Sequence, residues 1–184
     1  MISSVGSDVV VLRAPVGWRM RSAQRVLVPV AGKGGHDALR ARMLGSMHRL
    51  GAREVTLLRV LPASATDREV AQAKQDLDRI ARDESPQGST TIVERSDQAI
   101  DVIARHGEDC DLIILGLQRG GREAQVIGPF TLGIAARLDC GIIMISSRDI
   151  GGSELRELGR KVRQVGAEGL KTPGRFKPKW PGDS

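Results

Sequence analysis

The sequence predicts an α/β protein built on a doubly wound sheet of five parallel strands, and two observations support this prediction. First, short apolar runs rich in β-branched residues alternate along the chain with longer segments in which apolar residues recur every three or four positions. Second, several of the short runs are apolar on both faces, as is typical of strands buried between two layers of helices. Such alternation indicates an open parallel sheet with right-handed crossovers.

Composition fits one globular domain with extensions. The chain has 184 residues, of which 40% are hydrophobic and only 2% aromatic, so we expect an aliphatic core. We expect a cytoplasmic protein, because no apolar run reaches the roughly 18–20 residues of a membrane span and no secretory leader is visible. The net charge of +6 lies mostly in the end segments. Because the core also lacks aromatic residues that stack on bases, we expect no nucleic-acid partner.

The ends of the chain differ from its centre. Residues 8–13 predict a strand with no helix of its own, and residues 2–13 resemble residues 136–147, which include the predicted last strand. Residues 1–24 are therefore interpreted as a strand left from a preceding repeat plus a basic linker, with an unrelated edge strand as the alternative. Residues 148–184 predict an amphipathic helix and a basic tail. We expect this tail to be disordered and solvated rather than bound to lipid.

The central domain, residues 25–147, begins with a strand over residues 25–30, in which Pro29 limits pairing near the end. A glycine-rich loop at residues 31–35 then leads into a helix predicted over residues 36–50, which Gly51 ends. The apolar stripe of this helix consists of Leu39, Met43, Met47 and Leu50.

The next strand is predicted over residues 54–61. Thr66 and Glu69 then form a capping box, in which each side chain accepts a hydrogen bond from the other residue's backbone. The helix that follows repeats its apolar residues at a helical period, and a short strand is expected over residues 90–94. Ser96 is expected to cap a helix over residues 97–106. The apolar residues of the helix that follows the capping box are Val70, Ala73, Leu77, Ile80 and Ala81.

Residues 111–147 are the most informative segment. A strand over residues 111–116 is followed by a loop rich in glycine and arginine, a helix over residues 129–138 and a last strand over residues 141–145. Pro129 suits the first helical position, because its missing N–H has no helical partner to lose there. Free backbone N–H groups at the start of this helix favour an anion.

This segment resembles the carboxyl-terminal half of the universal stress protein family. In that family, a strand ending in glycine precedes the pattern Gly-x-x-Gly-x9-Gly-Ser/Thr, which surrounds an ATP phosphate. Gly116 matches the first glycine, and Gly128 best matches the third, one residue early. Arg119 replaces the second glycine, and Pro129 stands where the hydroxyl residue should be. The resemblance covers residues 25–147.

The resemblance implies the strand order 3-2-1-4-5, as in the adenine nucleotide alpha hydrolase-like folds, with the N-terminal strand added at the edge of the last strand. Both glycine loops then lie at one crevice, where the strand order reverses. Family members usually carry Asp directly after the first strand, where this chain has Ala31. We therefore expect a degenerate nucleotide site for ATP or AMP. Its residues are Ala31, Gly32, Lys33, Val60, Gly116, Arg119, Gly128, Pro129, Phe130 and Thr131.

The sequence offers no catalytic or metal-binding constellation. Its three His and two Cys residues lack the spacing of metal ligands, and no Ser or Cys nucleophile has an evident base. Cys110 and Cys140 each precede a strand and are interpreted as buried structural thiols in preference to a redox pair. We expect a protein that is not an enzyme. A nucleotide hydrolase or adenylyl transferase, the enzymatic alternative, would need a metal-binding carboxylate in the crevice.

Two functions follow from the resemblance. The preferred one is a non-catalytic regulatory or sensor domain, forming the cytosolic C-terminal part of an amino acid or ion transporter and thereby tethered at the inner face of the plasma membrane. The alternative is a stand-alone universal stress protein that binds ATP or AMP. Family members commonly pair through the last strand, so we expect a homodimer or pseudo-dimer there, with residues 9–12 or a second chain lying antiparallel on it. The pairing residues would be Ile142, Ile143, Met144 and Ile145.

Overall fold

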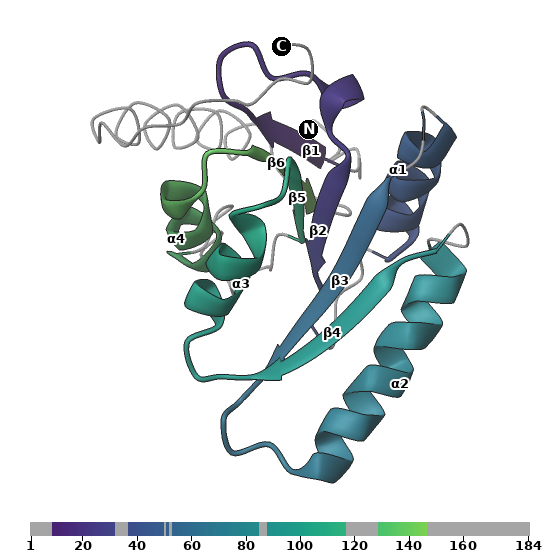
Figure 1. The fold of residues 1–184 in the computed structure, drawn as a ribbon, viewed down its shortest axis with the longest axis vertical. Coiled ribbons are helices and arrows are strands. Elements are labelled where there is room, and N and C mark those ends of the chain that lie inside the picture. Colours follow the sequence, from purple (N-terminus) through teal and green to yellow (C-terminus); the bar gives the residue numbers. More distant parts are fainter. Residues whose placement is uncertain are drawn as a thin grey trace, which may run out of the picture.

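The computed structural model describes residues 9–31, 37–49, 51, 53–84, 88–116 and 129–146. They form a six-stranded sheet with helices on both faces (Figure 1). The strands are β1 (Val9–Arg13), β2 (Arg25–Pro29), β3 (Glu54–Leu61), β4 (Thr90–Arg95), β5 (Leu112–Gly116) and β6 (Gly141–Ser146). The helices are α1 (Asp37–Arg49), α2 (Asp67–Glu84), α3 (Ala99–Gly107) and α4 (Pro129–Arg137), with a short 3-10 helix η1 (Met20–Ser22) before β2.

The strand order is β1-β6-β5-β2-β3-β4, and all neighbouring pairs among β2 to β6 are parallel. Counted from β2, this is the predicted order 3-2-1-4-5. β1 pairs antiparallel with β6, with Val10 opposite Ile145 and Leu12 opposite Ile143. The predicted fold class is therefore confirmed, including the additional N-terminal strand at the edge of the last strand.

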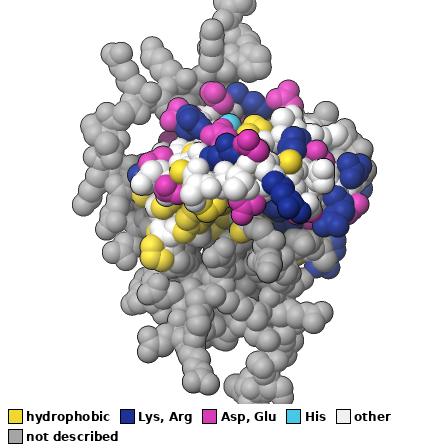
Figure 2. Space-filling view, turned by 90° about the horizontal axis from the view of Figure 1, so that it is seen from below, with side chains coloured by type: hydrophobic (Ala, Val, Ile, Leu, Met, Phe, Trp, Pro, Cys, Tyr) yellow, Lys and Arg dark blue, Asp and Glu magenta, His cyan; other side chains and the backbone are white. Residues whose placement is uncertain are grey.

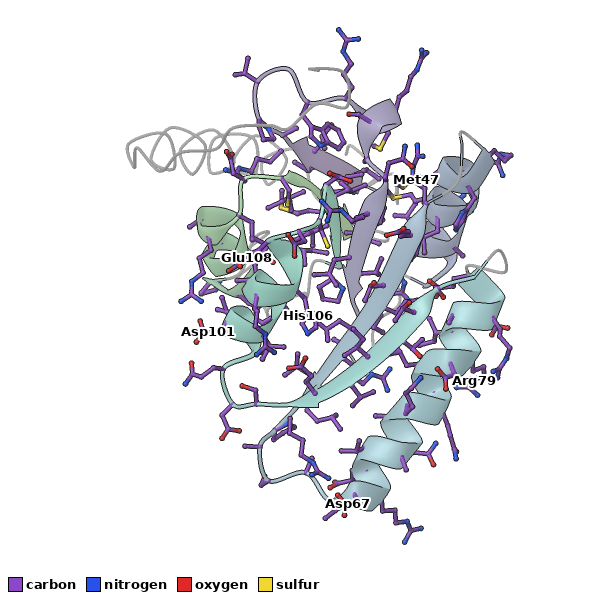
Figure 3. The ribbon with its side chains drawn as sticks, viewed as in Figure 1. Met47, Asp67, Arg79, Asp101, His106 and Glu108 are labelled. Atoms are coloured by element: carbon purple, nitrogen blue, oxygen red, sulfur yellow. The ribbon has the colours of Figure 1, made fainter. Side chains whose placement is uncertain are left out.

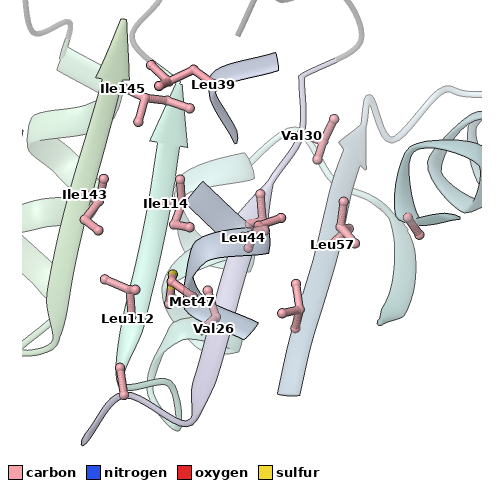
Figure 4. Packing of buried hydrophobic residues seen from close by; sticks show 14 of the residues in the cluster. Val26, Val30, Leu39, Leu44, Met47, Leu57, Leu112, Ile114, Ile143 and Ile145 are labelled. Atoms are coloured by element: carbon pink, nitrogen blue, oxygen red, sulfur yellow. The ribbon is translucent and has the colours of Figure 1, made fainter. Parts of the chain in front are cut away.

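Two apolar cores lie on opposite faces of the sheet, because alternate strand residues point to opposite sides. Helices α1 and α2 cover one core, and α3 and α4 cover the other. Figure 4 shows the first core, in which Leu44 and Met47 of α1 point toward β2 and β5. Both cores are aliphatic, as composition predicts. Fully buried side chains in the second core include Leu27, Ile113, Ile134 and Ile142.

Local signals placed the start of α2 correctly and the start of α3 less well. The capping box is present: Thr66 N–H donates to the Glu69 carboxylate at 2.7 Å, and Glu69 N–H donates to the Thr66 hydroxyl at 3.3 Å. The sequence predicts that Ser96 caps a helix that starts at residue 97, and this prediction is wrong. The Ser96 hydroxyl accepts from Gln98 N–H at 2.9 Å, and α3 begins at Ala99. Asp97 instead accepts from Ala63 N–H at 3.0 Å, which holds the chain outside the helix.

The segment before β2 packs against the amino ends of the strands. Arg13 donates to the carbonyl oxygen of Leu138 at 2.7 Å, and Ala23 is fully buried. The side chains of Trp18 and Met20 pack against the core under α1 and α2. This segment, predicted as a basic linker, is thus held on the sheet. The predicted helix and tail after residue 147 lie outside the described residues, and the division into three regions stays a prediction.

None of the helices in the described part of the chain is both long enough and apolar enough to span a membrane.

Candidate functional site

The strand order reverses at the boundary between β2 and β5. The chain proceeds from β2 through α1 to β3 in one direction, and from β5 through α4 to β6 in the other. α1 and α4 lie on opposite faces of the sheet, so the two crossovers diverge at this boundary. Open α/β sheets bind ligands at this kind of position.

Pro29 ends the pairing of β2 with β5. Val30 N–H donates to the carbonyl oxygen of Leu58 in β3 at 2.8 Å, whereas the carbonyl oxygen of Arg25 accepts from Asp111 N–H, before β5, at 2.9 Å. Successive residues of a central parallel strand bond to opposite neighbours, so Pro29 faces β5 like Arg25. Proline has no N–H, and the ladder toward β5 therefore loses its donor at this residue.

The registers of the two ladders show the consequence. β2 pairs with β3 from Arg25 to Pro29, but its pairing with β5 covers only Val26 and Leu27. Past Leu27, β2 and β5 are no longer joined by a ladder, although each strand continues. Ala31, just beyond β2, and Gly116, the last residue of β5, are both exposed at these ends. The ladder between the two central strands thus ends before the predicted crevice.

Helix α4 has its amino terminus at the same edge of the sheet, because the helix leads back to the start of β6, which is parallel to β5. Pro129 occupies the first helical position, as predicted. Phe130 is 45% exposed, and Thr131 is only 5% exposed. The first turn of this helix has backbone N–H groups without helical partners, which is the environment that suits a phosphate or carboxylate.

Val60 lies at the far side of β2 from Gly116, near the carboxyl end of β3. Its side chain packs against the core under α3 and α4, on the same face of the sheet as Thr131 and Ile134 of α4. Val60 can therefore contribute an apolar wall only on the α4 side of the crevice.

The predicted site residues thus fall into two groups. Ala31, Val60, Gly116 and Pro129–Thr131 gather at the carboxyl edge of the sheet, which faces the viewer in Figure 2. That view shows hydrophobic side chains gathered on one side of this end and most Lys and Arg side chains on the other. Gly32, Lys33, Arg119 and Gly128 lie outside the described residues. The set as a ligand site stays a prediction.

One charged cluster was missed by the sequence reasoning. Glu94 of β4 lies 2.5 Å from His106 Nε2 and accepts from Arg105 at 2.5 Å, which fastens α3 to β4 (Figure 3 labels His106). The hydrogen bond with His106, together with the charge of Arg105, lowers the pKa of Glu94. No local spacing connects Glu94 to the last turn of α3, so only the folded chain reveals this contact.

The described residues can be searched for a metal site. Among the side chains that the structure describes, no group of three or more His, Cys, Asp or Glu residues is arranged to hold a metal ion. Among the residues described at the crevice, the backbone N–H groups at the start of α4 are polar groups that a ligand could meet. Such N–H groups favour an anion.

The sequence matches no protein-family model and no curated protein. The structure is similar to that of a universal stress protein from Archaeoglobus fulgidus, with a TM-score of 0.54 and 18% identity over 67% of this chain and 98% of that chain. The fold is that of the universal stress proteins. A universal stress protein from Archaeoglobus fulgidus in complex with dAMP matches with a TM-score of 0.52 and 17% identity, over 67% of this chain and 98% of that chain. A functionally unknown protein from Pseudomonas aeruginosa PAO1 matches with a TM-score of 0.54 and 15% identity, over 89% of this chain and 57% of that one.

Proposed function

We propose that this chain is a non-catalytic regulatory domain of the universal stress protein type, with a weak adenine nucleotide site between the carboxyl ends of β2 and β5. The observation that carries the proposal is the loss of the β2–β5 ladder after Leu27, at the point where the strand order reverses. The free N–H groups at the start of α4 add a place for phosphate. A protein of the same fold has been crystallised with dAMP, which supports an adenine nucleotide as ligand.

The site is degenerate because Ala31 stands where relatives usually carry a carboxylate. A carboxylate at this position accepts hydrogen bonds from the O–H and N–H groups of a nucleoside, and a methyl group accepts none. Losing one hydrogen bond to a charged partner costs about 1.5–3 kcal/mol, or roughly 10-fold to 150-fold in affinity. We therefore expect AMP or ATP to bind in the high micromolar to millimolar range, as a weakly held signal.

Regulation fits the described part of the crevice better than turnover. Ala31, Val60, Gly116 and Phe130 supply no acid, base or nucleophile, and the Thr131 hydroxyl belongs to a buried side chain. General acid–base catalysis needs a titratable group within hydrogen-bond reach of the reacting atoms. Binding without reaction would then bias the conformation of the loops that adjoin the crevice.

We further propose that the domain works as the cytosolic C-terminal part of an amino acid or ion transporter and stays beside the membrane. β1 lies antiparallel on β6, as the last strand of a copy related by a twofold axis would lie. This supports a pseudo-dimer in which β1 takes the partner's place on Ile142–Ile145. The coding sequence upstream of this chain tests the proposal: membrane-spanning segments would support it, and a complete soluble reading frame would overturn it.

Calorimetric titration with AMP and ATP tests the nucleotide site. Ala31→Asp should improve the dissociation constant at least about tenfold, which corresponds to about 1.4 kcal/mol. Ala14→Asp is the matched control, because Ala14 is also exposed but lies before β2, away from the crevice. It should leave binding unchanged. Mass spectrometry of the denatured wild type should find no co-purified nucleotide.

Two results would count against the proposed site. Wild-type affinity in the low micromolar range would favour the stand-alone ATP or AMP binder. Equal affinities for the Ala31→Asp and Ala14→Asp variants would show that residue 31 does not contact the nucleotide. The crevice would then not be the binding site.

A further inference from the structure

Five arginines gather at the end of the molecule opposite the crevice. They are Arg19, Arg21, Arg25, Arg49 and Arg53, and we call them the arginine face. They come from the flank of η1, the start of β2, the last turn of α1 and the residue before β3. Figures 1 and 3 show η1 and the end of α1 at the top of the molecule, whereas Asp67 at the start of α2 lies at the bottom.

Contacts between these segments show that the arginines form one surface. The Nη1 atom of Arg53 lies 3.4 Å from the Gln24 side-chain oxygen, and its Nη2 lies 3.5 Å from the carbonyl oxygen of Arg21. A Cβ built at Gly51 would lie 3.3 Å from Nη1 of the same guanidinium, which brings the segment after α1 beside it. Arg53 itself is buried, with 8% exposure, whereas the other four arginines are exposed.

The local charge balance is positive. Two carboxylates are adjacent to the arginine face: Glu54, opposite Arg25 in the strand register, and Asp111. The Asp111 carboxylate accepts from the N–H groups of Gln24 and Arg25, both at 2.9 Å. The four exposed arginines against these two carboxylates leave two positive charges on this part of the surface. Other acidic residues at this end lie before β5 and β6, so its charge is polarised: Glu108, Asp109 and Asp139.

An apolar tip projects beside these cations. Val16 is fully exposed, with 102% relative accessibility, at a turn in which Trp18 N–H donates to the carbonyl oxygen of Pro15 at 3.1 Å. Gly17 in this turn has a φ of +82°, a conformation that glycine adopts readily. Trp18, in contrast to Val16, is partly buried. Its Nε1 donates to the carbonyl oxygen of Asp111 at 3.0 Å, which leaves the indole unavailable for stacking on a base.

We propose that the arginine face and Val16 form a docking surface for an anionic lipid bilayer. Guanidinium groups pair with headgroup phosphates, and the exposed apolar tip enters the interfacial layer beside them. A nucleic acid would leave Val16 in water and would find no free aromatic ring among the described residues of this surface. Docking in this orientation turns the carboxyl edge of the sheet away from the membrane. The surface is independent of the nucleotide site, and either can fail without the other.

Co-sedimentation of the full chain with vesicles tests the proposal. The wild type should bind vesicles that contain phosphatidylserine at low salt, and should not bind vesicles of phosphatidylcholine alone. Each arginine near an anionic surface contributes roughly fivefold to binding. Arg19→Glu with Arg21→Glu should therefore weaken binding by at least about 25-fold. Val16→Trp should strengthen it several-fold, because a tryptophan side chain prefers the membrane interface.

A matched double variant controls for net charge. Arg68→Glu with Arg79→Glu changes the charge of the full chain equally, but both residues are exposed on α2, away from the arginine face. This control should change vesicle binding less than about twofold. Because all these variants keep residues 148–184, any contribution of that basic segment is the same in each. Unchanged thermal unfolding should show that the substituted residues do not support the fold.

Three outcomes would overturn the proposal. Equal losses in the two double variants would show that only net charge matters. Tighter, Arg19- and Arg21-dependent binding to a single-stranded RNA than to vesicles would identify a nucleic-acid surface. Saturable binding of inorganic phosphate at this face, with no binding to vesicles, would show that free phosphate is the ligand.

Discussion

The indole ring of Trp18 lies so close to Gly141 that a Cβ on residue 141 would be 2.5 Å from the indole Cζ2 atom. The same ring bonds to the carbonyl oxygen of Asp111, whose N–H and carboxylate bond to the start of β2. One aromatic side chain therefore joins the segment before β2 to the amino ends of β5 and β6. The N-terminal segment is part of the folded unit for this reason.

Gly141→Ala should destabilise the protein by about 1–3 kcal/mol, because the added methyl group has no room beside the indole ring. Urea denaturation measures this cost. In a Trp18→Ala background, the same substitution should cost less than about 0.5 kcal/mol, since the clashing atoms are gone. An equal cost in both backgrounds would mean that Trp18 does not occupy this space.

Gly45→Ala should have the opposite effect. Gly45 lies inside α1, and its nearest neighbour to a built Cβ is the Arg49 side chain at 3.9 Å, an ordinary contact. Alanine restricts the unfolded chain and favours the helix, so the free energy of unfolding should rise by about 0.5–1 kcal/mol. Destabilisation in a thermal melt would show that α1 packs more tightly at this residue than described.

Arg40 and Glu84 form a buried bidentate ion pair that joins α1 to α2, with N–O distances of 2.6 Å and side-chain exposures of 8% and 6%. Glu84→Gln should cost about 3–5 kcal/mol, because it leaves the Arg40 charge buried without its carboxylate. The exposed Asp101–Arg137 pair is the control, and Asp101→Asn should cost less than about 1 kcal/mol. Similar costs in urea denaturation would contradict this ranking.

Burial raises the pKa of the Cys140 thiol to about 12, with a further contribution from the neighbouring Cys110. The thiol then ionises more easily in the unfolded chain than in the folded one. Below about pH 9 the thiol is protonated in both states, and its ionisation does not lower the free energy of unfolding. As pH rises from 9 toward 12, the free energy of unfolding should fall by up to about 1.4 kcal/mol per pH unit. Cys140→Ala should show a shallower decline above about pH 9, and parallel declines in urea denaturation would refute the shift.

Patterns local in the sequence predicted most of the fold. Pro29, the Thr66–Glu69 capping box and the apolar runs of β5 and β6 each carry their signal within a few residues. The strand order itself came from a family resemblance, because periodicity does not tell which strands are neighbours.

Features that depend on distant partners were not predictable in this way. The Trp18–Gly141 contact, the Arg40–Glu84 pair and the Glu94–His106 bond join residues far apart in the chain. The local sequence predicts Asp97 at the start of α3, but its carboxylate accepts from the N–H group of Ala63, in the segment after β3. The candidate site was predicted from two glycine loops, and the structure describes the strand and helix ends that adjoin them.

Amide NMR of the labelled protein during titration with AMP tests the nucleotide site most directly. Resonances of Val30, Ala31, Gly116 and Thr131 should shift progressively and together, while those of Arg49 and Arg53 at the other end stay in place. Shifts confined to the arginine face, or none at millimolar AMP, would contradict a nucleotide site between β2 and β5.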